Sequence, residues 1–188
     1  MVHVIGPKDP RRKDAINTTS TSKTWSRQLS PFLLGPVKLY GNYISQNVEN
    51  AWQFSRVYPE FADFIDEDPT PDYFEWAEMG WADVKAHRYP MGRDTKPLYS
   101  YWDGQKLSYI EARKKIYIPL YAVAVRSTDA YKKLRELYEE KEEIWLWDFD
   151  GYNHIEAGIP LWDVVNQKNR KMGHAFVLAM MLEQQKNA

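Results

Sequence analysis

The sequence contains no cysteine among its 188 residues. This absence excludes thiol nucleophiles, CxxC redox chemistry, iron–sulfur clusters and thiolate zinc sites. An excess of charge of one sign is also missing, because 25 Lys and Arg residues stand against 26 Asp and Glu residues and the net charge is -1. We therefore expect no general electrostatic attraction to nucleic acid or to a membrane, so that any anion site must be local.

Long apolar runs are missing as well. No stretch approaches the roughly 20 residues that a membrane helix needs, and the first residues lack the apolar segment of a signal peptide. The sequence therefore predicts a cytoplasmic protein without a membrane partner. Aromatic residues are abundant instead, with 8 Trp, 13 Tyr and 7 Phe. Large rings with a polar group suit both a packed core and a site for a flat ligand.

The composition changes near residue 30. Residues 1–29 contain a basic run at 8–13 and a Thr/Ser run at 18–22, and neither buries enough apolar surface to offset the entropy lost on ordering. We predict a polar, partly disordered arm over 1–29 and a single domain over 30–188.

Periodicity within 30–188 predicts a mostly helical α+β domain with a small number of short strands. A helix is expected after Ser45, and a long loop over 87–104. Another helix is expected from Thr70 and Pro71, with Tyr73, Ala77, Trp81 and Val84 on one face. A capping box at Ser108 and Glu111 starts the next helix, and Pro119 predicts a kink or a break with a second helix to about Arg126. Thr128 starts a further helix, alternation predicts a strand over 144–151, and an apolar helix covers 175–185.

Four side chains near the start of the domain share helical spacing. Glu49, Trp52, Gln53 and Arg56 stand at i, i+3, i+4 and i+7, which places a carboxylate, an indole, an amide and a guanidinium on one side. They suit the wall of a binding site, with an aromatic face for a base. A solvent-facing stripe with Trp52 in the core is the structural alternative.

Two carboxylates, Asp148 and Asp150, end the predicted strand on one face. Burial of one of them would raise its pKa and make proton transfer useful. The alternative is a strand that leaves the core, with its acids capping the turn at Gly151.

A basic segment, 168–174, leads into the last helix. Lys171 precedes Gly173 and His174, and free N–H groups at a helix start beside cations suit a phosphate. A basic loop before a buried helix is the alternative. The histidine spacings fit no metal template, so neither a metal nor a cofactor is expected.

The segment 49–56, Glu-Asn-Ala-Trp-Gln-Phe-Ser-Arg, resembles the NADAR family, whose members carry Glu-His-x-(aromatic)-Gln-x-x-Lys on a helix. Segment 109–113 is similar to that family's Trp-x-x-x-Arg helix, and 134–148 to its leucine helix and strand ending in an acid. Segment 172–180 is similar to its closing Gly-rich helix. The sequence also resembles uncharacterised bacterial and phage proteins. Asn50 stands where the family has His, and Arg56 where it has Lys.

The resemblance implies a NADAR-like fold and an N-glycosidase that acts on an ADP-ribose-type nucleotide or on an ADP-ribosylated base in nucleic acid. It matches Glu49 and Asp148 to the family's acids, and Trp52, Gln53, Arg56 and Arg113 to its binding positions. The alternative is a module without catalytic activity that binds a nucleotide or nucleic acid in the same pocket. Oligomeric state is not indicated by the sequence.

Overall fold

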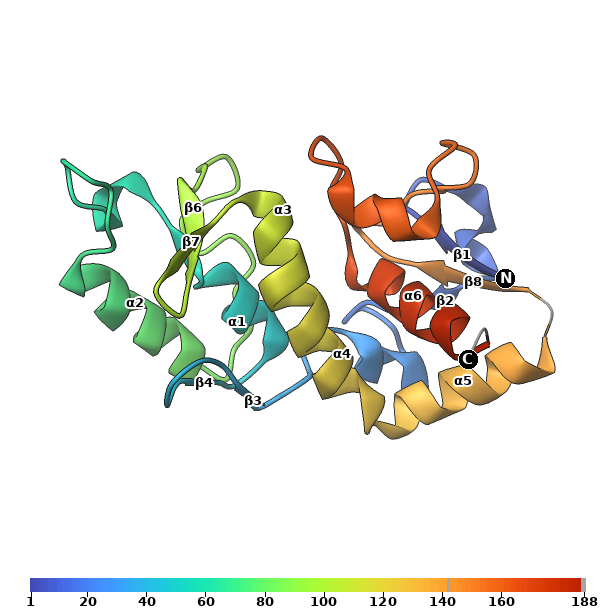
Figure 1. Cartoon of the computed structure of the whole chain (residues 1–188). Coiled ribbons are helices and arrows are strands. Elements are labelled where there is room, and N and C mark those ends of the chain that lie inside the picture. The colour runs from blue at the N-terminus through green and yellow to red at the C-terminus, as the bar shows by residue number, and fades with distance from the viewer. Residues whose placement is uncertain (142, 187–188) are drawn as a thin grey trace. The chain divides into compact units, whose positions relative to one another are not determined.

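The computed structural model describes residues 1–141 and 143–186 and has the α+β architecture that the sequence predicts (Figure 1). The chain divides into two compact units. Unit 1 contains Met1–Leu33 and the described residues from Tyr121 on, and unit 2 contains Leu34–Leu120. Residues 30–188, predicted as one domain, are therefore shared between the two units.

Unit 1 is built on a parallel sheet in the order β1–β8–β2. Its strands are β1 (Val2–Ile5), β2 (Ile16–Asn17) and β8 (Ile144–Trp147). The predicted alternation in β8 is confirmed, because Ile144 and Leu146 are buried while the two Trp side chains between and after them are half-buried. The strand ends at Trp147, four residues before the predicted end, because the ladder with β1 and β2 stops there.

The predicted disordered arm over 1–29 is wrong. Val4 and Ile5 are fully buried in β1, and Thr18 Oγ1 donates to the carbonyl oxygen of Trp147 at 3.1 Å. Two 3-10 helices, η1 (Pro10–Lys13) and η2 (Trp25–Leu29), complete the segment. Pairing with β8, more than 100 residues away in sequence, supplies the partners that composition alone does not reveal.

One helix of unit 1, α6 (His174–Lys186), packs on β1, and η5 (Leu161–Asn166) packs on α6. The unit also contains α5 (Asp129–Glu140), which packs on η2, and most of α4 (Ile118–Arg126). The predicted start of α5 is confirmed, because Thr128 Oγ1 accepts a hydrogen bond from Tyr131 N at 3.1 Å. Over the described residues, no helix has the length and apolar character that crossing a membrane requires.

Unit 2 contains two small antiparallel sheets and two main helical segments. The strands are β3 (Val37–Lys38), β4 (Ile44–Ser45), β5 (Arg56–Val57), β6 (Tyr99–Trp102) and β7 (Gln105–Leu107). The helices are α1 (Val48–Gln53), η3 (Pro59–Phe61), α2 (Pro71–Ala82), α3 (Tyr109–Ala112) and the π-helical η4 (Arg113–Tyr117).

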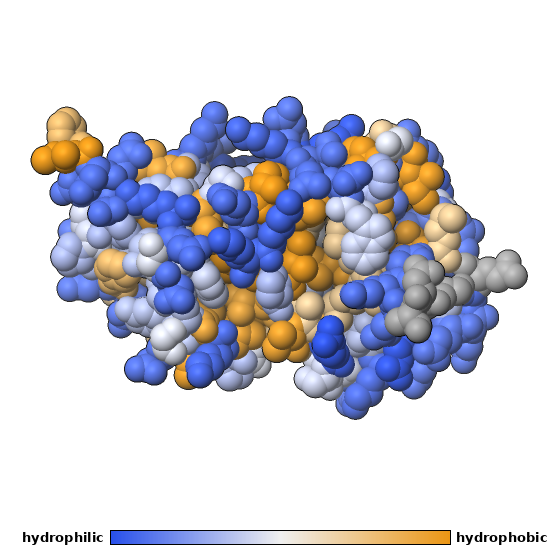
Figure 2. Space-filling view, in the orientation of Figure 1, coloured by the Kyte–Doolittle hydropathy of each residue, from blue (hydrophilic) through white to orange (hydrophobic). Residues whose placement is uncertain are grey.

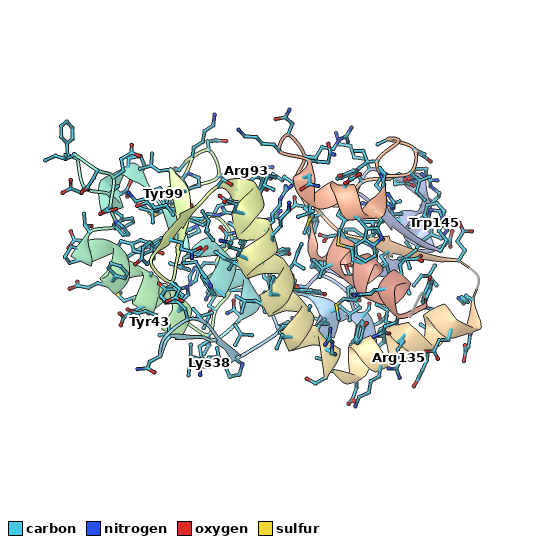
Figure 3. All side chains as sticks on the ribbon, viewed as in Figure 1. Lys38, Tyr43, Arg93, Tyr99, Arg135 and Trp145 are labelled. Atoms are coloured by element: carbon cyan, nitrogen blue, oxygen red, sulfur yellow. The ribbon has the colours of Figure 1, made fainter. Side chains whose placement is uncertain are left out.

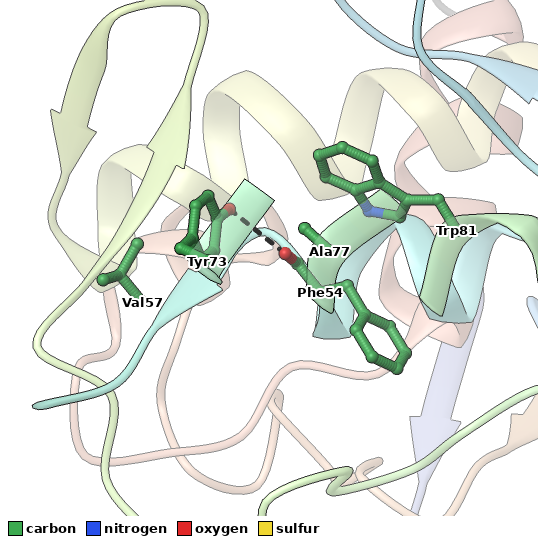
Figure 4. Packing of buried hydrophobic residues seen from close by; sticks show 5 residues of the cluster. All are labelled: Phe54, Val57, Tyr73, Ala77 and Trp81. Carbon is green, nitrogen blue, oxygen red and sulfur yellow. Dashed lines mark hydrogen bonds between the residues drawn. The ribbon is translucent and has the colours of Figure 1, made fainter. Parts of the chain in front are cut away.

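The core of unit 2 forms where α2 meets the end of α1 (Figure 4). Tyr73, Ala77 and Trp81 are buried on one face of α2, as their spacing predicts. Tyr73 donates from its hydroxyl to the carbonyl oxygen of Phe54 at 3.1 Å. A Cβ at Gly80 would lie 2.1 Å from the Phe54 ring, so only glycine allows this contact.

Two predictions around α2 are corrected by the structure. Val84, predicted on its buried face, is 80% exposed because the helix ends at Ala82. The predicted loop is confirmed over 87–98, whereas residues 99–102 form β6, which pairs with β5 and, across a turn at Asp103 and Gly104, with β7. Pro97 and Gly104 favour a loop locally, whereas the strand is defined by partners elsewhere in the chain.

The long helical segment after β7 begins as predicted. Ser108 accepts from the N–H of Glu111, and the Glu111 carboxylate accepts from the N–H of Ser108. The predicted break at Pro119 takes the form of the π-helical η4, in which Ile118 N donates to the carbonyl oxygen of Arg113. Helix α4 then runs to Arg126, as predicted. Proline cannot donate to the carbonyl four residues earlier, so a wider turn just before it is physically reasonable.

The stability of unit 1 should fall when the pH drops below about 6.5, the ordinary pKa of histidine. Burial against Trp145 lowers the pKa of His3 from 6.5, and contact with Glu143 only partly offsets this. The unfolded chain therefore binds a proton in this window that the folded chain does not, so acid favours unfolding. Urea titrations at pH 5 to 8 should show wild type losing stability relative to His3→Gln as pH falls. The opposite slope would contradict the lowered pKa.

Candidate functional site

A buried carboxylate–amide pair occupies helix α1. Asn47 caps the helix by accepting from Asn50 N at 2.8 Å, which corrects the predicted start at Ser45. Glu49 and Gln53 are 6% and 4% exposed, and Gln53 Nε2 donates to Glu49 Oε1 at 2.8 Å. The predicted i, i+4 proximity of Glu49 and Gln53 is confirmed.

Trp52 lies in an aromatic cluster beside this pair. The centroid of its ring lies 5.2 Å from the ring centroid of Tyr117 and 6.3 Å from that of Tyr109. Arg56 Cζ lies 5.0 Å from the Trp52 ring centroid. Arg56 itself belongs to β5, because α1 ends at Gln53. Trp52 is only 9% exposed, so it supports the site as a packed side chain, and its predicted use as an open face for a base is not supported.

Tyr109 is the exposed ring of this cluster. It is 39% exposed, and the fully buried Arg113 lies beneath it with Cζ 4.2 Å from the ring and Nη2 donating to its hydroxyl at 2.9 Å. The structure thus brings Arg113 next to the residues of α1 through Tyr109 and Trp52. The sequence indicates no role for Tyr117. The i, i+4 spacing of Tyr109 and Arg113, within the segment that is similar to a Trp-x-x-x-Arg helix, is a signal for Tyr109.

Asn50 of α1 holds a loop in place. The residue is fully buried. Its Nδ2 donates to the carbonyls of Asp83 and Lys85 at 3.0 and 2.9 Å, and its Oδ1 accepts from His87 N at 2.8 Å. Every hydrogen-bonding group of this amide is thus used by the backbone of 83–87, which assigns Asn50 a positioning role.

Replacing Asn50 with Ala should loosen the 83–87 segment. Three backbone groups lose their partner, and an unsatisfied buried group costs about 1–3 kcal/mol. Amide hydrogen exchange at His87 should accelerate at least tenfold, while exchange at Tyr101, whose N–H donates to the Ser55 carbonyl, should not change. Equal protection of His87 in both proteins would show that other contacts hold the loop.

Asp148 in unit 1 is a buried carboxylate with three hydrogen-bond donors. His174 Nδ1 and Ala175 N lie 3.0 and 3.1 Å from its Oδ2, and Asp150 N donates to Oδ1 at 3.3 Å. Burial alone would raise the pKa of Asp148, but the charge and hydrogen bond of His174 and the two backbone donors outweigh it, so the pKa is lowered. Asp148 is therefore an anion that orders its surroundings rather than the proton donor that a raised pKa would produce.

His174 is held between two acceptors. Its Nδ1 faces Asp148 Oδ2 and its Nε2 lies 2.8 Å from the carbonyl oxygen of Thr18. Because both ring nitrogens face oxygen atoms, the imidazolium form, which donates from both, satisfies them together. The residue thus joins β8, α6 and the N-terminal segment of unit 1.

The predicted phosphate pocket at the start of α6 is wrong. The N–H of Ala175 in the first turn already donates to Asp148, so an internal carboxylate occupies the positive end of the helix. A Cβ at Gly173 would lie 2.0 Å from Asp148 Oδ2, which explains the glycine by packing. Lys171 lies outside this contact, with its Nζ 3.9 Å from Asp150 Oδ1.

The two predicted acids belong to different units: Glu49 lies in unit 2 and Asp148 in unit 1. That they face a common cleft stays a prediction. The described residues include no group of three or more His, Asp and Glu side chains arranged to hold a metal ion.

Comparison with known proteins gives one family match. Residues 8–159 match the model of a family of unknown function, DUF6939. No curated protein and no solved structure matches the chain.

Proposed function

Because the chain belongs to DUF6939, a family of unknown function, we propose an activity from its resemblance to the NADAR family and from the residues of unit 2: hydrolysis of the C1′–N glycosidic bond of an ADP-ribose-type nucleotide or of an ADP-ribosylated base. The observation that carries the proposal is the buried Glu49 carboxylate, oriented by Gln53 at 2.8 Å beside an aromatic and cationic cluster. A preorganised carboxylate of this kind is what a developing sugar cation requires.

Glu49 has the central chemical role in this proposal. When the C1′–N bond breaks, its electron pair leaves with the base nitrogen and the sugar gains oxocarbenium character. The Glu49 carboxylate stabilises that positive charge and accepts a proton from the water whose oxygen bonds to C1′. The departing base nitrogen takes up a proton from solvent and Glu49 releases its own proton to solvent, so that the products are the free base and the sugar hydroxyl.

The cluster around Glu49 suits the rest of such a substrate. The exposed Tyr109 ring offers a face for a base, and Arg56 and Arg113 provide positive charge near a substrate that carries phosphate. Asp148, the other predicted acid, belongs to unit 1, where its lowered pKa keeps it ionised beside His174. The predicted role of Asp150 in proton transfer stays a prediction; its side chain is 28% exposed in unit 1.

A binding module without catalysis is the second candidate function. It is favoured by Asn50, because this residue stands where the NADAR family has histidine and is fully engaged in holding the backbone of 83–87. Such a module would hold a nucleotide, or a nucleotide unit of nucleic acid, against the same cluster without breaking a bond.

Incubation with NAD, ADP-ribose and ADP-ribosylated DNA, followed by chromatography, separates the two candidates. Release of a free base by wild type, and not by Glu49→Gln, supports the glycosidase. Micromolar binding of any of these compounds with no product supports the module. If wild type releases no product and binds none of these compounds, both proposals are contradicted.

A further inference from the structure

A loop of unit 2, residues 62–69, presents two large apolar side chains to solvent. Phe64 is 100% exposed and Ile65 is 91% exposed. We call this pair the Phe64–Ile65 tip. Figure 2 shows a hydrophobic projection at a hydrophilic edge of unit 2, over the loop that precedes α2 in Figure 1. Single exposed apolar residues are ordinary, but two adjacent ones on a projecting tip are a candidate contact surface.

The loop is ordered by its own hydrogen bonds. A β-bridge between Ala62 and Pro69 closes it, and Asp63 N donates to the carbonyl of Asp68 at 2.7 Å. At the tip, Ile65 N donates to Asp63 Oδ1 at 2.8 Å. The apolar pair is therefore held outward by a closed turn rather than carried on an open segment.

Contacts from the neighbouring hairpin fix the loop further. Lys106 Nζ lies 2.7 Å from both the Asp66 carbonyl and Asp68 Oδ1. The hydroxyl of Tyr99, labelled in Figure 3, donates to the carbonyl of Glu67, a residue with a left-handed φ of 57°. A surface that is ordered before binding loses less conformational entropy on association.

The loop that carries the tip is acidic. Residues 62–69 include four acidic residues, Asp63, Asp66, Glu67 and Asp68, and no Lys or Arg. Lys106 neutralises part of this charge through Asp68. The tip is thus an apolar contact within an acidic rim.

We propose that the Phe64–Ile65 tip docks a separate protein that offers an apolar pocket rimmed with Lys and Arg. Burial of the two side chains supplies the attraction, and the acidic rim selects a basic partner and makes association salt-dependent. Anionic lipid head groups would be repelled by the same rim, which favours a protein over a membrane. This proposal is independent of the glycosidase activity.

The test places a photocrosslinking residue, p-benzoylphenylalanine, at position 65 of the full chain in its own cells. The matched control carries it at Val123, which is 73% exposed on α4. A protein crosslinked from position 65 and not from position 123 is identified, purified and titrated against wild type, Phe64→Ser and Val123→Ser. Because the Phe64 side chain is fully exposed and does not pack in the core, Phe64→Ser should leave the melting temperature unchanged.

We expect Phe64→Ser to weaken binding of that protein at least tenfold and Val123→Ser to leave the binding unchanged. The affinity of wild type should fall as the salt concentration rises from 50 to 500 mM, a range over which charges become strongly screened. Three results would overturn the proposal: no adduct specific to position 65, an adduct only with a second copy of this chain, or equal binding by Phe64→Ser.

Discussion

Replacing Asp148 with Asn is expected to destabilise unit 1 by about 3–5 kcal/mol, the typical cost of removing one partner from a buried ion pair. The substitution leaves His174 without a counter-charge, and its new amide N–H groups face the backbone donors of Ala175 or Asp150. For a chain of this length the loss corresponds to a fall in melting temperature of roughly 6–20 °C, measurable by calorimetry.

The pH dependence of this prediction follows from the lowered pKa of Asp148. A carboxyl group whose folded pKa lies below its ordinary value of 3.8 stabilises the fold above that pH, and the contribution is lost as the pH falls through the folded pKa. The difference between wild type and Asp148→Asn should therefore shrink in acid below about pH 4. Asp163→Asn, the same change at an exposed position, is the control and should change the stability by less than about 0.5 kcal/mol.

Replacing Glu49 with Gln should reduce the turnover number of the proposed glycosidase by about 10²–10⁴, the usual contribution of a positioned acid or base. The substitution removes the negative charge and the basic oxygen but keeps the shape. The new side-chain carbonyl still accepts the hydrogen bond from Gln53, so the fold of α1 and the binding of substrate should persist.

The measurement is the rate of base release together with the substrate dissociation constant for each protein. Glu75→Gln on the exposed face of α2 is the control, and it should match wild type in both quantities. A variant at Glu49 that turns over normally would remove this carboxylate from the proposed mechanism. A variant that loses binding and turnover equally would instead assign Glu49 to ground-state binding.

Local signals predicted the parts of the fold whose partners are close in sequence. The Ser108–Glu111 capping box, the Thr128 cap and the buried face of α2 depend on residues within two or three turns, and all are present. The predicted start of α1 lies two residues too early, because both Ser45 and Asn47 are residue types that cap helices well. Only the structure shows that Asn47 is the one that accepts a hydrogen bond from the helix backbone.

The features of the candidate site also divide into those that local spacing predicts and those that depend on distant segments of the chain. The Glu49–Gln53 hydrogen bond follows from i, i+4 spacing on one helix. By contrast, the functions of Asn50 and Gly173 depend on segments 33 and 25 residues away, the backbone from Asp83 and the Asp148 side chain. No local pattern distinguishes an asparagine that holds a loop from one that faces solvent.

The amino-acid sequence by itself determined the mixed α+β class, the starts of α2, α3 and α5 and the alternation of β8, because each depends on backbone hydrogen bonds and side chains that are near neighbours. Only the tertiary structure decided that residues 2–5 form a buried strand, that 99–107 forms a hairpin, and that Asp148 fills the end of α6. Those features need partners far along the chain, and such pairing is stabilised by burial that no short segment possesses alone.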